Sequence, residues 1–295
     1  MTTIAVSVYD GIATITMNRP KSYNAITTAD YNAFANALRE IDKMEDVLIT
    51  VWQATGKWFC AGTDVKNRSF DKPLDGTDNS DFTLRRAFLQ GVVHTTTDCG
   101  RALYTHSKIL VAALNGPVMG IAAAFLGYFD FIYSVPEAWL CVPFTFLGTQ
   151  RSALSNDVSR LHFHTFYEGI IAEGGSSVSF INRMGVAQAN EVLIWGKKKT
   201  AQELLGSGFI NEIFPSQSAE NFHATVRARL MEELSGLDPT SVLAVKKLLR
   251  AGLNEKNDPD AVNLRESYAQ AERFVSGTPA VQFGRIARKE IRHKL

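Results

Sequence analysis

The sequence has few cysteines and no excess of charge of one sign. Its three cysteines, Cys60, Cys99 and Cys141, are widely spaced and form no Cys-x-x-Cys pair. This excludes a disulfide framework and a zinc knuckle, and it indicates a reducing compartment. Lys and Arg number 31 and Asp and Glu number 30, a net charge of +1. The charge balance therefore gives no reason to expect nucleic acid or a membrane surface as a partner.

Long uninterrupted apolar runs are also missing. The most apolar stretch, residues 109–135, is broken by Asn115, Pro117 and Asp130 among others. It predicts a strand, a loop and a buried helix rather than a membrane span, so no membrane insertion is expected. The first residues contain no basic region followed by an apolar stretch, and no signal peptide is expected either. With 295 residues, 45% of them hydrophobic, the chain can bury a sizeable core.

Strand and helix patterns alternate along the first 200 residues, which is typical of an α/β fold. Alternating residues at 4–8 and 12–17, joined by Asp10-Gly11, predict a β-hairpin. The further expected elements are a helix capped by Thr28 and running to about residue 44, strands at 47–52, 109–114, 131–134 and 139–142, and helices at 85–106 and 120–127.

From about residue 201 the strand patterns stop, and residues 204–215 are expected to form a helix end followed by a short extended segment. Helical patterns follow at 217–234, 239–252 and 259–276, and the tail adds a fourth. We therefore place a domain boundary near residue 200, with a core at 1–200 and a helical region at 201–295.

Two glycine-bearing turns each follow a predicted strand, at residues 59–65 and 114–124. A strand, a turn of small residues and then a helix leave the first N–H groups of the helix unpaired. Two such turns side by side present two donors to one oxygen, which is an oxyanion hole. Either turn by itself is typical of a structural connection. Neither has the glycine spacing of a Rossmann fingerprint or the lysine of a P-loop.

Three motifs resemble the enoyl-CoA hydratase/isomerase (crotonase) superfamily. They are Met17-Asn18-Arg19-Pro20 with Asn24-Ala25-Ile26, then Phe59-Cys60-Ala61-Gly62-Thr63-Asp64, then Leu114-Asn115-Gly116-Pro117-Val118-Met119-Gly120. They occur in the family's order over most of the chain. The resemblance implies an α/β fold of the ClpP/crotonase type, a spiral of ββα units, with a C-terminal helical region that builds homotrimers or hexamers.

The resemblance also implies an acyl-CoA thioester as substrate. The N–H groups of Thr63 and Ile121 would hold the thioester oxygen, and residues 61–65 would lie along the acyl-CoA. The implied substrate-binding residues are Ala61, Gly62, Thr63, Asp64, Val65 and Ile121. Most members have Ala where Thr63 stands, but only the backbone N–H is needed there. Coenzyme A is part of the substrate, and no other cofactor and no metal are expected.

The implied reaction depends on which carboxylates are present. Two glutamates serve family hydratases, and their positions here are Ala124 and Phe144, neither of which transfers a proton. Glu173, within residues 170–179, matches a segment of fungal peroxisomal Δ3,Δ2-enoyl-CoA isomerases that carries their single catalytic glutamate. One carboxylate suffices to move a proton from C2 to C4. The alternative is that Glu173 is only a first-turn acid of a helix that begins near Ser176.

The expected function is therefore the shift of a double bond from 3-enoyl-CoA to 2-enoyl-CoA, in fatty-acid β-oxidation or a related peroxisomal pathway. Two alternatives remain open: a hydratase or dehydratase of fungal secondary metabolism, and a catalytically impaired scaffold of the same fold. The tripeptide His293-Lys294-Leu295 is similar to the Ser-Lys-Leu signal read by a peroxisomal import receptor. It predicts a peroxisomal location.

Residues 149–169 are an insertion relative to the family pattern. The insertion is explained by a surface loop with neighbouring ends, by a lid over the acyl pocket, or by a translated intron. We favour the intron, because the family pattern resumes on both sides. His162-Phe163-His164 has no partnering cysteine or carboxylate pattern, so no metal site is predicted there. The polar stretch at 68–81 is predicted to be mobile.

Overall fold

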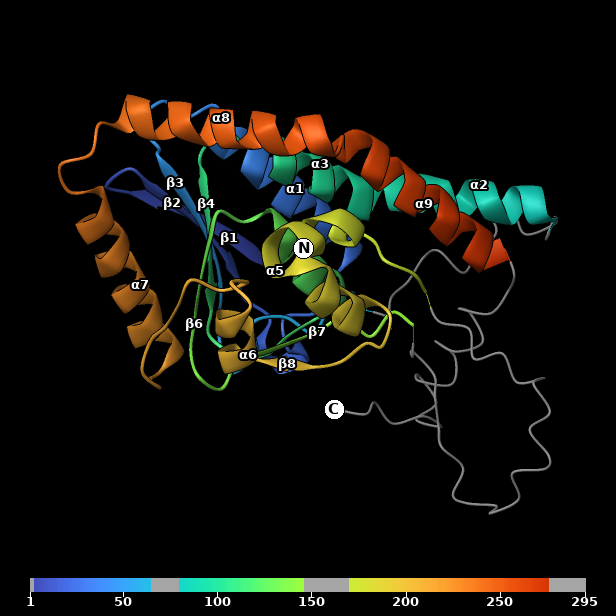
Figure 1. The fold of residues 1–295 in the computed structure, drawn as a ribbon, viewed down its shortest axis with the longest axis horizontal. Coiled ribbons are helices and arrows are strands. Elements are labelled where there is room, and N and C mark those ends of the chain that lie inside the picture. The colour runs from blue at the N-terminus through green and yellow to red at the C-terminus, as the bar shows by residue number, and fades with distance from the viewer. Residues whose placement is uncertain (1–2, 65–79, 146–169, 276–295) are drawn as a thin grey trace, which may run out of the picture.

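The computed structural model describes residues 3–64, 80–145 and 170–275. At its centre is a six-stranded sheet in the order β1-β2-β3-β4-β6-β9 (Figure 1). Its strands are β1 (Ile4–Tyr9), β2 (Ile12–Met17), β3 (Ile49–Ala54), β4 (Ile109–Leu114), β6 (Phe131–Ser134) and β9 (Glu212–Ile213). The first two strands form the predicted antiparallel hairpin, and the others are added in parallel. β4 is apolar and buried throughout, as expected for a strand covered on both faces.

A smaller sheet lies beyond the ends of the main strands. It consists of β5 (Val118–Met119), β7 (Trp139–Cys141) and β8 (Lys199–Thr200), in the order β5-β7-β8. Each of β5 and β7 follows a strand of the main sheet after a short connection, so the chain turns from one sheet into the other twice. An isolated parallel bridge between Cys60 and Val118 adds the first glycine turn to this edge.

The helix α1 (Thr28–Asp42) covers the main sheet and begins with a capping box. The side chain of Thr27 accepts a hydrogen bond from the N–H of Asp30, and the Asp30 carboxylate accepts one from the N–H of Thr27. The expectation that Thr28 caps this helix is therefore wrong by one residue. Thr27 is the cap because it stands three residues before an acid that returns the bond.

The helix predicted at 85–106 is divided into three parts. They are α2 (Asp81–Val92), a single π-helical turn η3 (Val93–Thr97) and α3 (Asp98–Thr105). In η3 the hydroxyl of Thr95 donates to the carbonyl of Gly91 at 2.8 Å. Threonine hydroxyls that bond to a carbonyl of the preceding turn disturb helical geometry. The three consecutive threonines at 95–97 thus accompany a break that the apolar spacing did not indicate.

The helix predicted at 120–127 is confirmed as α4 (Gly120–Phe125) followed by a 3-10 turn η4 (Leu126–Tyr128). The next described helix, α5 (Ser176–Leu193), begins at the predicted residue. Aromatic rings of Phe34, Trp52, Phe125 and Phe129 pack together under α1 and α4, with centroid distances from 4.8 to 6.4 Å. This aromatic packing holds the last residue of α4, Phe125, against α1 and the sheet.

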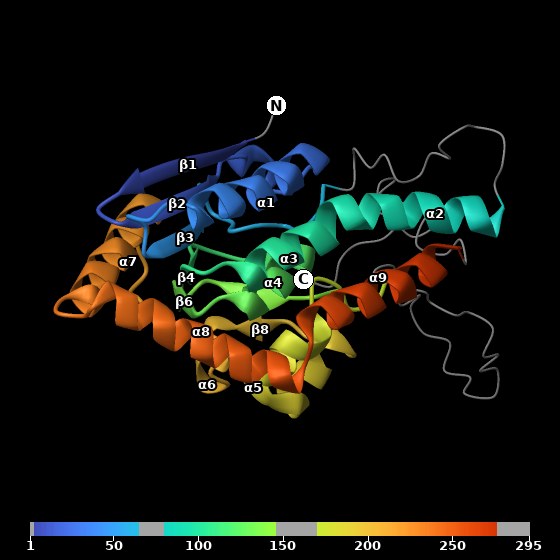
Figure 2. The same cartoon turned by 90° about the horizontal axis from the view of Figure 1, so that it is seen from above.

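Within the described residues, four helices follow residue 200. They are α6 (Ala201–Gly206), α7 (Ala219–Leu234), α8 (Pro239–Lys256) and α9 (Pro259–Val275). The three predicted C-terminal helices are confirmed. The helix end and short extended segment expected within residues 204–215 are confirmed as the end of α6 and as β9, but β9 pairs with β6, so the main sheet continues beyond residue 201. In both views α9 lies alongside α2, and the pair extends away from the sheet (Figures 1 and 2).

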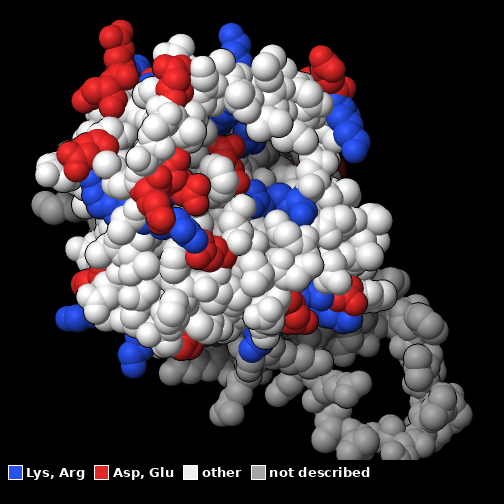
Figure 3. Space-filling view, turned by 60° about the vertical axis from the view of Figure 1, so that its left-hand side comes forward, with Lys and Arg blue, Asp and Glu red and all other residues white. Residues whose placement is uncertain are grey.

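Acidic and basic side chains are interspersed on the face shown in Figure 3. Among the residues described, no helix is long and apolar enough to cross a membrane. In the same part of the chain, no three His, Cys, Asp or Glu side chains are grouped to hold a metal ion.

Several predictions concern residues outside the described ranges. They are the polar stretch up to residue 79, Val65, the insertion at 149–169 with His162-Phe163-His164, the fourth C-terminal helix, and the tripeptide His293-Lys294-Leu295. These remain predictions.

Candidate active site

The first glycine turn is attached to the chain segment that precedes α1. Ile26 donates its N–H to the carbonyl of Gly62 and accepts a bond from the N–H of Asp64, both at 2.8 Å. These two bonds form a parallel bridge between Ile26 and Thr63. In such a bridge the N–H of the middle residue, Thr63, points away from the pairing strand. The predicted oxyanion donor is therefore directed to the side opposite Ile26.

Two buried polar side chains hold this turn. Asn24 donates to the carbonyls of Thr55 and Trp58 at 2.9 and 2.8 Å. The thiol of Cys60 accepts a bond from the N–H of Gly62 at 3.3 Å and donates to the carbonyl of Asn24 at 3.1 Å. Burial raises the pKa of the Cys60 thiol to about 12, so it remains a neutral thiol at neutral pH. Cys60 is thus a structural group of the turn and not a nucleophile.

The second glycine turn lies directly against the first. The N–H of Met119 donates to the carbonyl of Cys60 at 2.8 Å. Gly62 and Gly120 both have positive φ, +86° and +57°, and face each other. A Cβ on Gly62 would stand 3.6 Å from the Cα of Gly120 and 3.2 Å from the carbonyl oxygen of Met119. This close approach brings the two turns together, as the oxyanion-hole prediction requires.

Ile121 is the second residue of α4, after the N-cap Met119. Its N–H is one of the four at a helix start that have no partner within the helix. The N–H of Thr63 likewise has no backbone acceptor within the described part of the chain. Adjacent turns thus present two N–H donors for which residues 3–64, 80–145 and 170–275 supply no backbone acceptor.

Asp64, expected along the acyl-CoA, forms an ion pair with Arg19 at 2.9 Å. The pair is largely covered, with the two side chains 8% and 23% exposed. A second guanidinium nitrogen of Arg19 donates to the carbonyl of Ala25 at 2.8 Å. Arg19 therefore ties the end of the β-hairpin to the far side of the first turn. Ala61 is fixed as well, since its N–H donates to the carbonyl of Tyr23 at 3.0 Å.

Glu173 lies in a tight turn just before α5. Its carbonyl accepts bonds from the N–H and the hydroxyl of Ser176 at 3.2 and 2.8 Å. The next two residues, Gly174 and Gly175, both have positive φ, +64° and +75°. A Cβ on Gly174 would stand 2.9 Å from the side chain of Ile121. The turn is therefore pressed against the start of α4, beside the second predicted oxyanion donor.

Glu173 and Thr63 line one small cavity of about 30 Å³. This is room for about one water molecule, so the cavity marks a meeting point of the two groups and not the extent of an acyl-CoA. The sequence did not single out its other lining residues as site residues: Tyr31, Phe88, Val92, Thr95, Thr96, Ile170, Gln270 and Phe274. The structure thus brings Glu173, Thr63 and Ile121 together from three separate segments.

Three of the residues that the sequence did not single out bring hydroxyl groups to the cavity, one from α1 and two from η3. The hydroxyl of Tyr31 on α1 pairs with the hydroxyl of Thr63 at 2.6 Å. Thr95 and Thr96 belong to the π-helical turn η3, and such turns occur frequently at functional sites. The run of three threonines at 95–97 was the feature of the sequence that could have indicated this turn and its place at the site. No signal was available for Gln270, whose place on the site depends on the packing of α9.

The two positions that would carry hydratase glutamates are fully enclosed by the core. Ala124 is 0% exposed and Phe144 is 2% exposed. Both belong to the continuous hydrophobic cluster around the sheet. Neither has a titratable group, so neither supplies the acid or the base that hydration requires.

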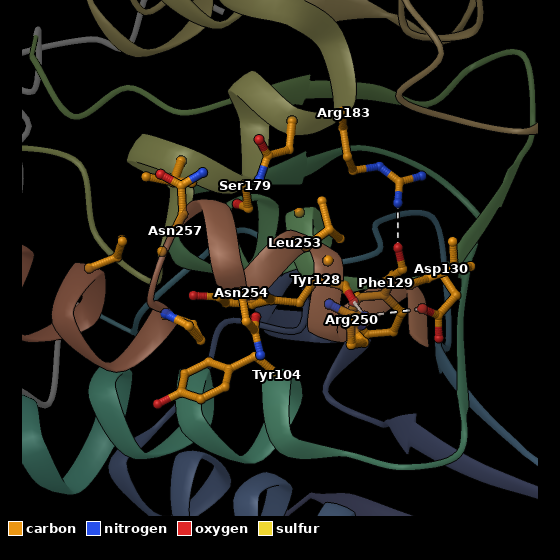
Figure 4. Close-up of a pocket in the computed structure, with 18 of the residues that line it drawn as sticks. Tyr104, Tyr128, Phe129, Asp130, Ser179, Arg183, Arg250, Leu253, Asn254 and Asn257 are labelled. Atoms are coloured by element: carbon orange, nitrogen blue, oxygen red, sulfur yellow. Dashed lines mark hydrogen bonds and ion pairs between the residues drawn. The ribbon is translucent and has the colours of Figure 1, made fainter. Parts of the chain in front are cut away.

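A larger cavity of about 820 Å³ lies between α5, α8 and η4 (Figure 4). In it Arg183 donates to the carbonyl of Phe129, and Arg250 pairs with Asp130 at 3.1 Å. Burial lowers the pKa of Arg183 to about 10, which leaves it charged at neutral pH. Of the residues predicted for catalysis or substrate binding, those that the structure describes do not line this cavity.

Comparisons with known proteins identify relatives of this chain. A family model described as enoyl-CoA hydratase/isomerase matches residues 12–132, and a second model of the same description matches residues 155–274. A Delta(3,5)-Delta(2,4)-dienoyl-CoA isomerase of Pyricularia oryzae is 34% identical over 292 residues, covering 96% of each chain. A 3,2-trans-enoyl-CoA isomerase of Saccharomyces cerevisiae is 29% identical over 286 residues, covering 95% of this chain and 92% of that protein.

Solved structures show the same fold. An enoyl-CoA hydratase/isomerase of Pseudoalteromonas atlantica superposes with a TM-score of 0.75 at 23% identity, and 100% of each chain is covered. An enoyl-CoA hydratase of Mycobacterium avium subsp. paratuberculosis gives a TM-score of 0.74 at 19% identity, over 96% of this chain and 98% of that one. The predicted crotonase spiral is confirmed. The chain belongs to the enoyl-CoA hydratase/isomerase family.

Proposed function

We propose that this protein is an enoyl-CoA isomerase that converts a 3-enoyl-CoA to the 2-enoyl-CoA. The observation that carries the proposal is the shared cavity of Glu173 and Thr63, with the side chain of Ile121 packed against the next residue of the turn. The burial of Ala124 and Phe144 in apolar surroundings supports isomerisation over hydration. The names of the two isomerases that cover most of the chain support the same class of reaction.

In the proposed mechanism the ionised Glu173 carboxylate removes a proton from C2 of the thioester. The electron pair moves into the carbonyl to form an enolate conjugated with the C3–C4 double bond. The N–H groups of Thr63 and Ile121 stabilise the negative oxygen, an arrangement in which each donor typically contributes about 10²–10³ in rate. Glu173 then returns its proton to C4, and the double bond is left between C2 and C3. Coenzyme A is part of the substrate, and the proposed reaction requires no other cofactor.

The test offers purified protein two thioesters of the same length, 3-hexenoyl-CoA and 2-hexenoyl-CoA. Chromatography separates the double-bond isomers, and mass spectrometry detects the added water of 3-hydroxyhexanoyl-CoA. We expect isomerisation of the first to be faster than hydration of the second by at least tenfold. Faster hydration would replace the proposal with a hydratase, and no turnover of either would favour a scaffold.

A second candidate is a Δ3,5 to Δ2,4 dienoyl-CoA shift, favoured by the 34% identity to the Pyricularia protein of that name. That reaction delivers the proton to C6 and not to C4, so it needs a proton donor farther along the acyl chain. Adding 3,5-octadienoyl-CoA to the same assay distinguishes the two. A higher kcat/KM for the diene than for 3-hexenoyl-CoA would assign the dienoyl reaction.

The proposed setting is fatty-acid β-oxidation in the peroxisome. A mouse relative named Enoyl-CoA delta isomerase 3, peroxisomal, is 31% identical over 92% of this chain and 74% of its own length. The proposed import partner is the peroxisomal receptor that reads the tripeptide 293–295. A fluorescent protein fused to the N-terminus should collect in peroxisomes, and deletion of the three residues should release it into the cytosol.

We also propose that the protein is a homotrimer or a dimer of trimers. Exposed apolar side chains on α8 support this, since they form a surface suited to another copy: Val245, Leu248, Leu249 and Leu253. Light scattering after size-exclusion chromatography gives the mass, and a monomer would overturn the proposal.

A further inference from the structure

The turn that carries Glu173 is bonded to α9 on both sides of the glutamate. On the N-terminal side, the side-chain amide of Gln270 accepts a bond from the N–H of Ile171 at 3.2 Å and donates to its carbonyl at 3.0 Å. One planar amide thus pairs with both backbone groups of one residue, as a neighbouring strand would. Gln270 is 1% exposed, so water does not compete for these bonds.

On the C-terminal side, Glu266 makes the second attachment. Its carboxylate accepts bonds from the N–H groups of Gly175 and Ser177 at 2.7 and 3.0 Å, and from the hydroxyl of Ser177. The N-cap of α5 is Gly175, which has no side chain to cap the helix. Glu266 therefore performs the capping from another helix, and its negative charge complements the positive end of α5.

The two attachments have the same spacing, four residues, on α9 and in the turn. Glu266 and Gln270 are four residues apart and lie on one face of α9. Ile171 and Gly175 are four residues apart in the turn, with Glu173 midway between them. The face continues to Phe274, which lines the cavity with Glu173 and stacks on Phe88 of α2 at a centroid distance of 4.1 Å. The helix is therefore itself held in place by α2.

The turn requires external support because its own sequence is permissive. Gly174 and Gly175 both adopt positive φ, and glycine has more backbone freedom to lose than any other residue. Without bonds on either side, the Glu173 carboxylate would sample many positions relative to the two amides. A misplacement of about 1 Å can cost on the order of a hundredfold in rate.

We propose that Gln270 and Glu266 are positioning residues of the isomerase, which fix the backbone at Ile171 and at Gly175 and thereby aim the carboxylate of Glu173 at the substrate. The inference rests on the proposed function. It assigns α9, in the region expected only to build oligomers, a direct part in the active site of its own chain. Burial raises the pKa of the Glu266 carboxyl, and the bonds from Ser177 and Gly175 oppose that rise.

The test compares Gln270→Leu and Glu266→Gln with a control on the same helix, Glu272→Gln. The control makes the same chemical change as the second variant but removes only an exposed ion pair with Arg85. With 3-hexenoyl-CoA we expect kcat to fall about 10- to 100-fold in the first two variants. We expect KM to stay within about twofold and the control to match the wild type, because positioning acts on the proton transfer and not on binding.

A double-mutant cycle separates positioning from general stability. In a Glu173→Gln background, Gln270→Leu should have no further effect on the residual rate, because the group that it positions is gone. A loss in kcat that follows the fraction of unfolded protein, or kcat within twofold of wild type in both folded variants, would overturn the proposal. If Gln270→Leu does not fold, Glu266→Gln retains the side-chain shape and carries the test.

Amide hydrogen exchange gives a readout independent of turnover. The N–H of Ile171 should exchange at least tenfold faster in Gln270→Leu, and the N–H groups of Gly175 and Ser177 at least tenfold faster in Glu266→Gln. If the wild type does not isomerise 3-hexenoyl-CoA, the proposed function fails while the exchange result still decides the attachment. If the wild type is active and the variants equal it in kcat, the function stands and the positioning role fails.

Discussion

The turn that contains Thr63 is held by backbone hydrogen bonds and by buried side chains from nearby in the sequence, Asn24 and Cys60, whereas side chains of the distant helix α9 hold the turn that carries Glu173. Around Thr63 the bonds come from the backbone of Ile26 and from the segment before β5. Around Glu173 they come from Gln270 and Glu266, more than ninety residues further along the chain. Both turns contain glycines with positive φ. They therefore have similar backbone conformations and differ in the groups that hold them in place.

This difference predicts where substitutions are tolerated. A donor that is a backbone N–H does not depend on its own side chain, so the proposed role of Thr63 does not require a threonine at this position. A carboxylate must be delivered as a side chain to a definite point, and its support depends on the identity of two other side chains. The oxyanion donors should therefore respond to backbone changes, and the base should respond to side-chain changes.

The largest expected effect comes from removing the base without disturbing its turn. Glu173→Gln keeps the shape of the side chain and the backbone hydrogen bonds, but the amide cannot accept the proton from C2. We expect kcat for 3-hexenoyl-CoA to fall by about 10²–10⁴ with a nearly unchanged KM. Glu40→Gln, which removes an exposed acid paired with Lys43, should leave kcat unchanged. An unchanged rate in Glu173→Gln would move the catalytic role to another group.

The next largest effect is expected from a change that disturbs the backbone of the first glycine turn. In Gly62→Ala the new Cβ would meet the carbonyl of Met119 at 3.2 Å, at a φ of +86°. We expect kcat to fall about 10- to 100-fold as the Thr63 donor shifts, and stability to fall by about 1–2 kcal/mol.

The matched control for this change is Gly236→Ala. Its φ is +79° and its added Cβ would meet no atom within 4 Å. It should lower stability by a similar amount, measured by urea unfolding, and leave kcat unchanged. Equal kcat values in the two variants would show that the close contact of the turns does not matter for catalysis.

A smaller effect is expected from the ion pair that ties the hairpin to the first turn. Arg19→Met removes the guanidinium from the mostly buried Asp64 and should cost about 1–2 kcal/mol of stability and a few-fold in kcat. Arg85→Met breaks the more exposed pair with Glu272 and should cost less stability than Arg19→Met, because solvent screens that pair. Thermal unfolding and kcat measure both, and equal losses would remove the role assigned to Arg19.

The smallest effect on catalysis is expected from protonating or replacing two histidines that lie away from both turns. Burial lowers the pKa of His106 and of His223 from 6.5 to about 4. The unfolded chain takes up these protons below about pH 6.5, while the folded chain takes them up only near pH 4. Stability present above pH 6.5 should therefore decline as the pH falls towards 4, by at most ~1.4 kcal/mol per pH unit for each histidine.

Urea unfolding between pH 7 and pH 4.5 measures this slope. His223→Asn should make it shallower and leave kcat at pH 6 unchanged, since His223 contacts neither turn. A slope equal to that of the wild type would exclude His223 as a source of the pH dependence.

Much of the fold was predictable because its signals are local. The alternation in the hairpin, the apolar run of β4 and the glycines before α4 each indicate their structure within a few residues. The errors arose where a partner decided the outcome. Thr27 and not Thr28 caps α1 because Asp30 returns a bond to it. β9 forms beyond the expected last strand because the edge of β6 is available to it.

The sequence by itself determined the two glycine turns, because they depend on residue type and on a short spacing, whereas the proposed role of Glu173 came from a resemblance to fungal isomerases. Only the tertiary structure decided that the turns touch, that Glu173 shares a cavity with Thr63, and that Gln270 and Glu266 brace its turn. Those contacts join segments far apart in the chain, and their geometry depends on how α9 packs on α2. No periodicity within α9 distinguishes a face that supports a catalytic turn from one that packs against a core.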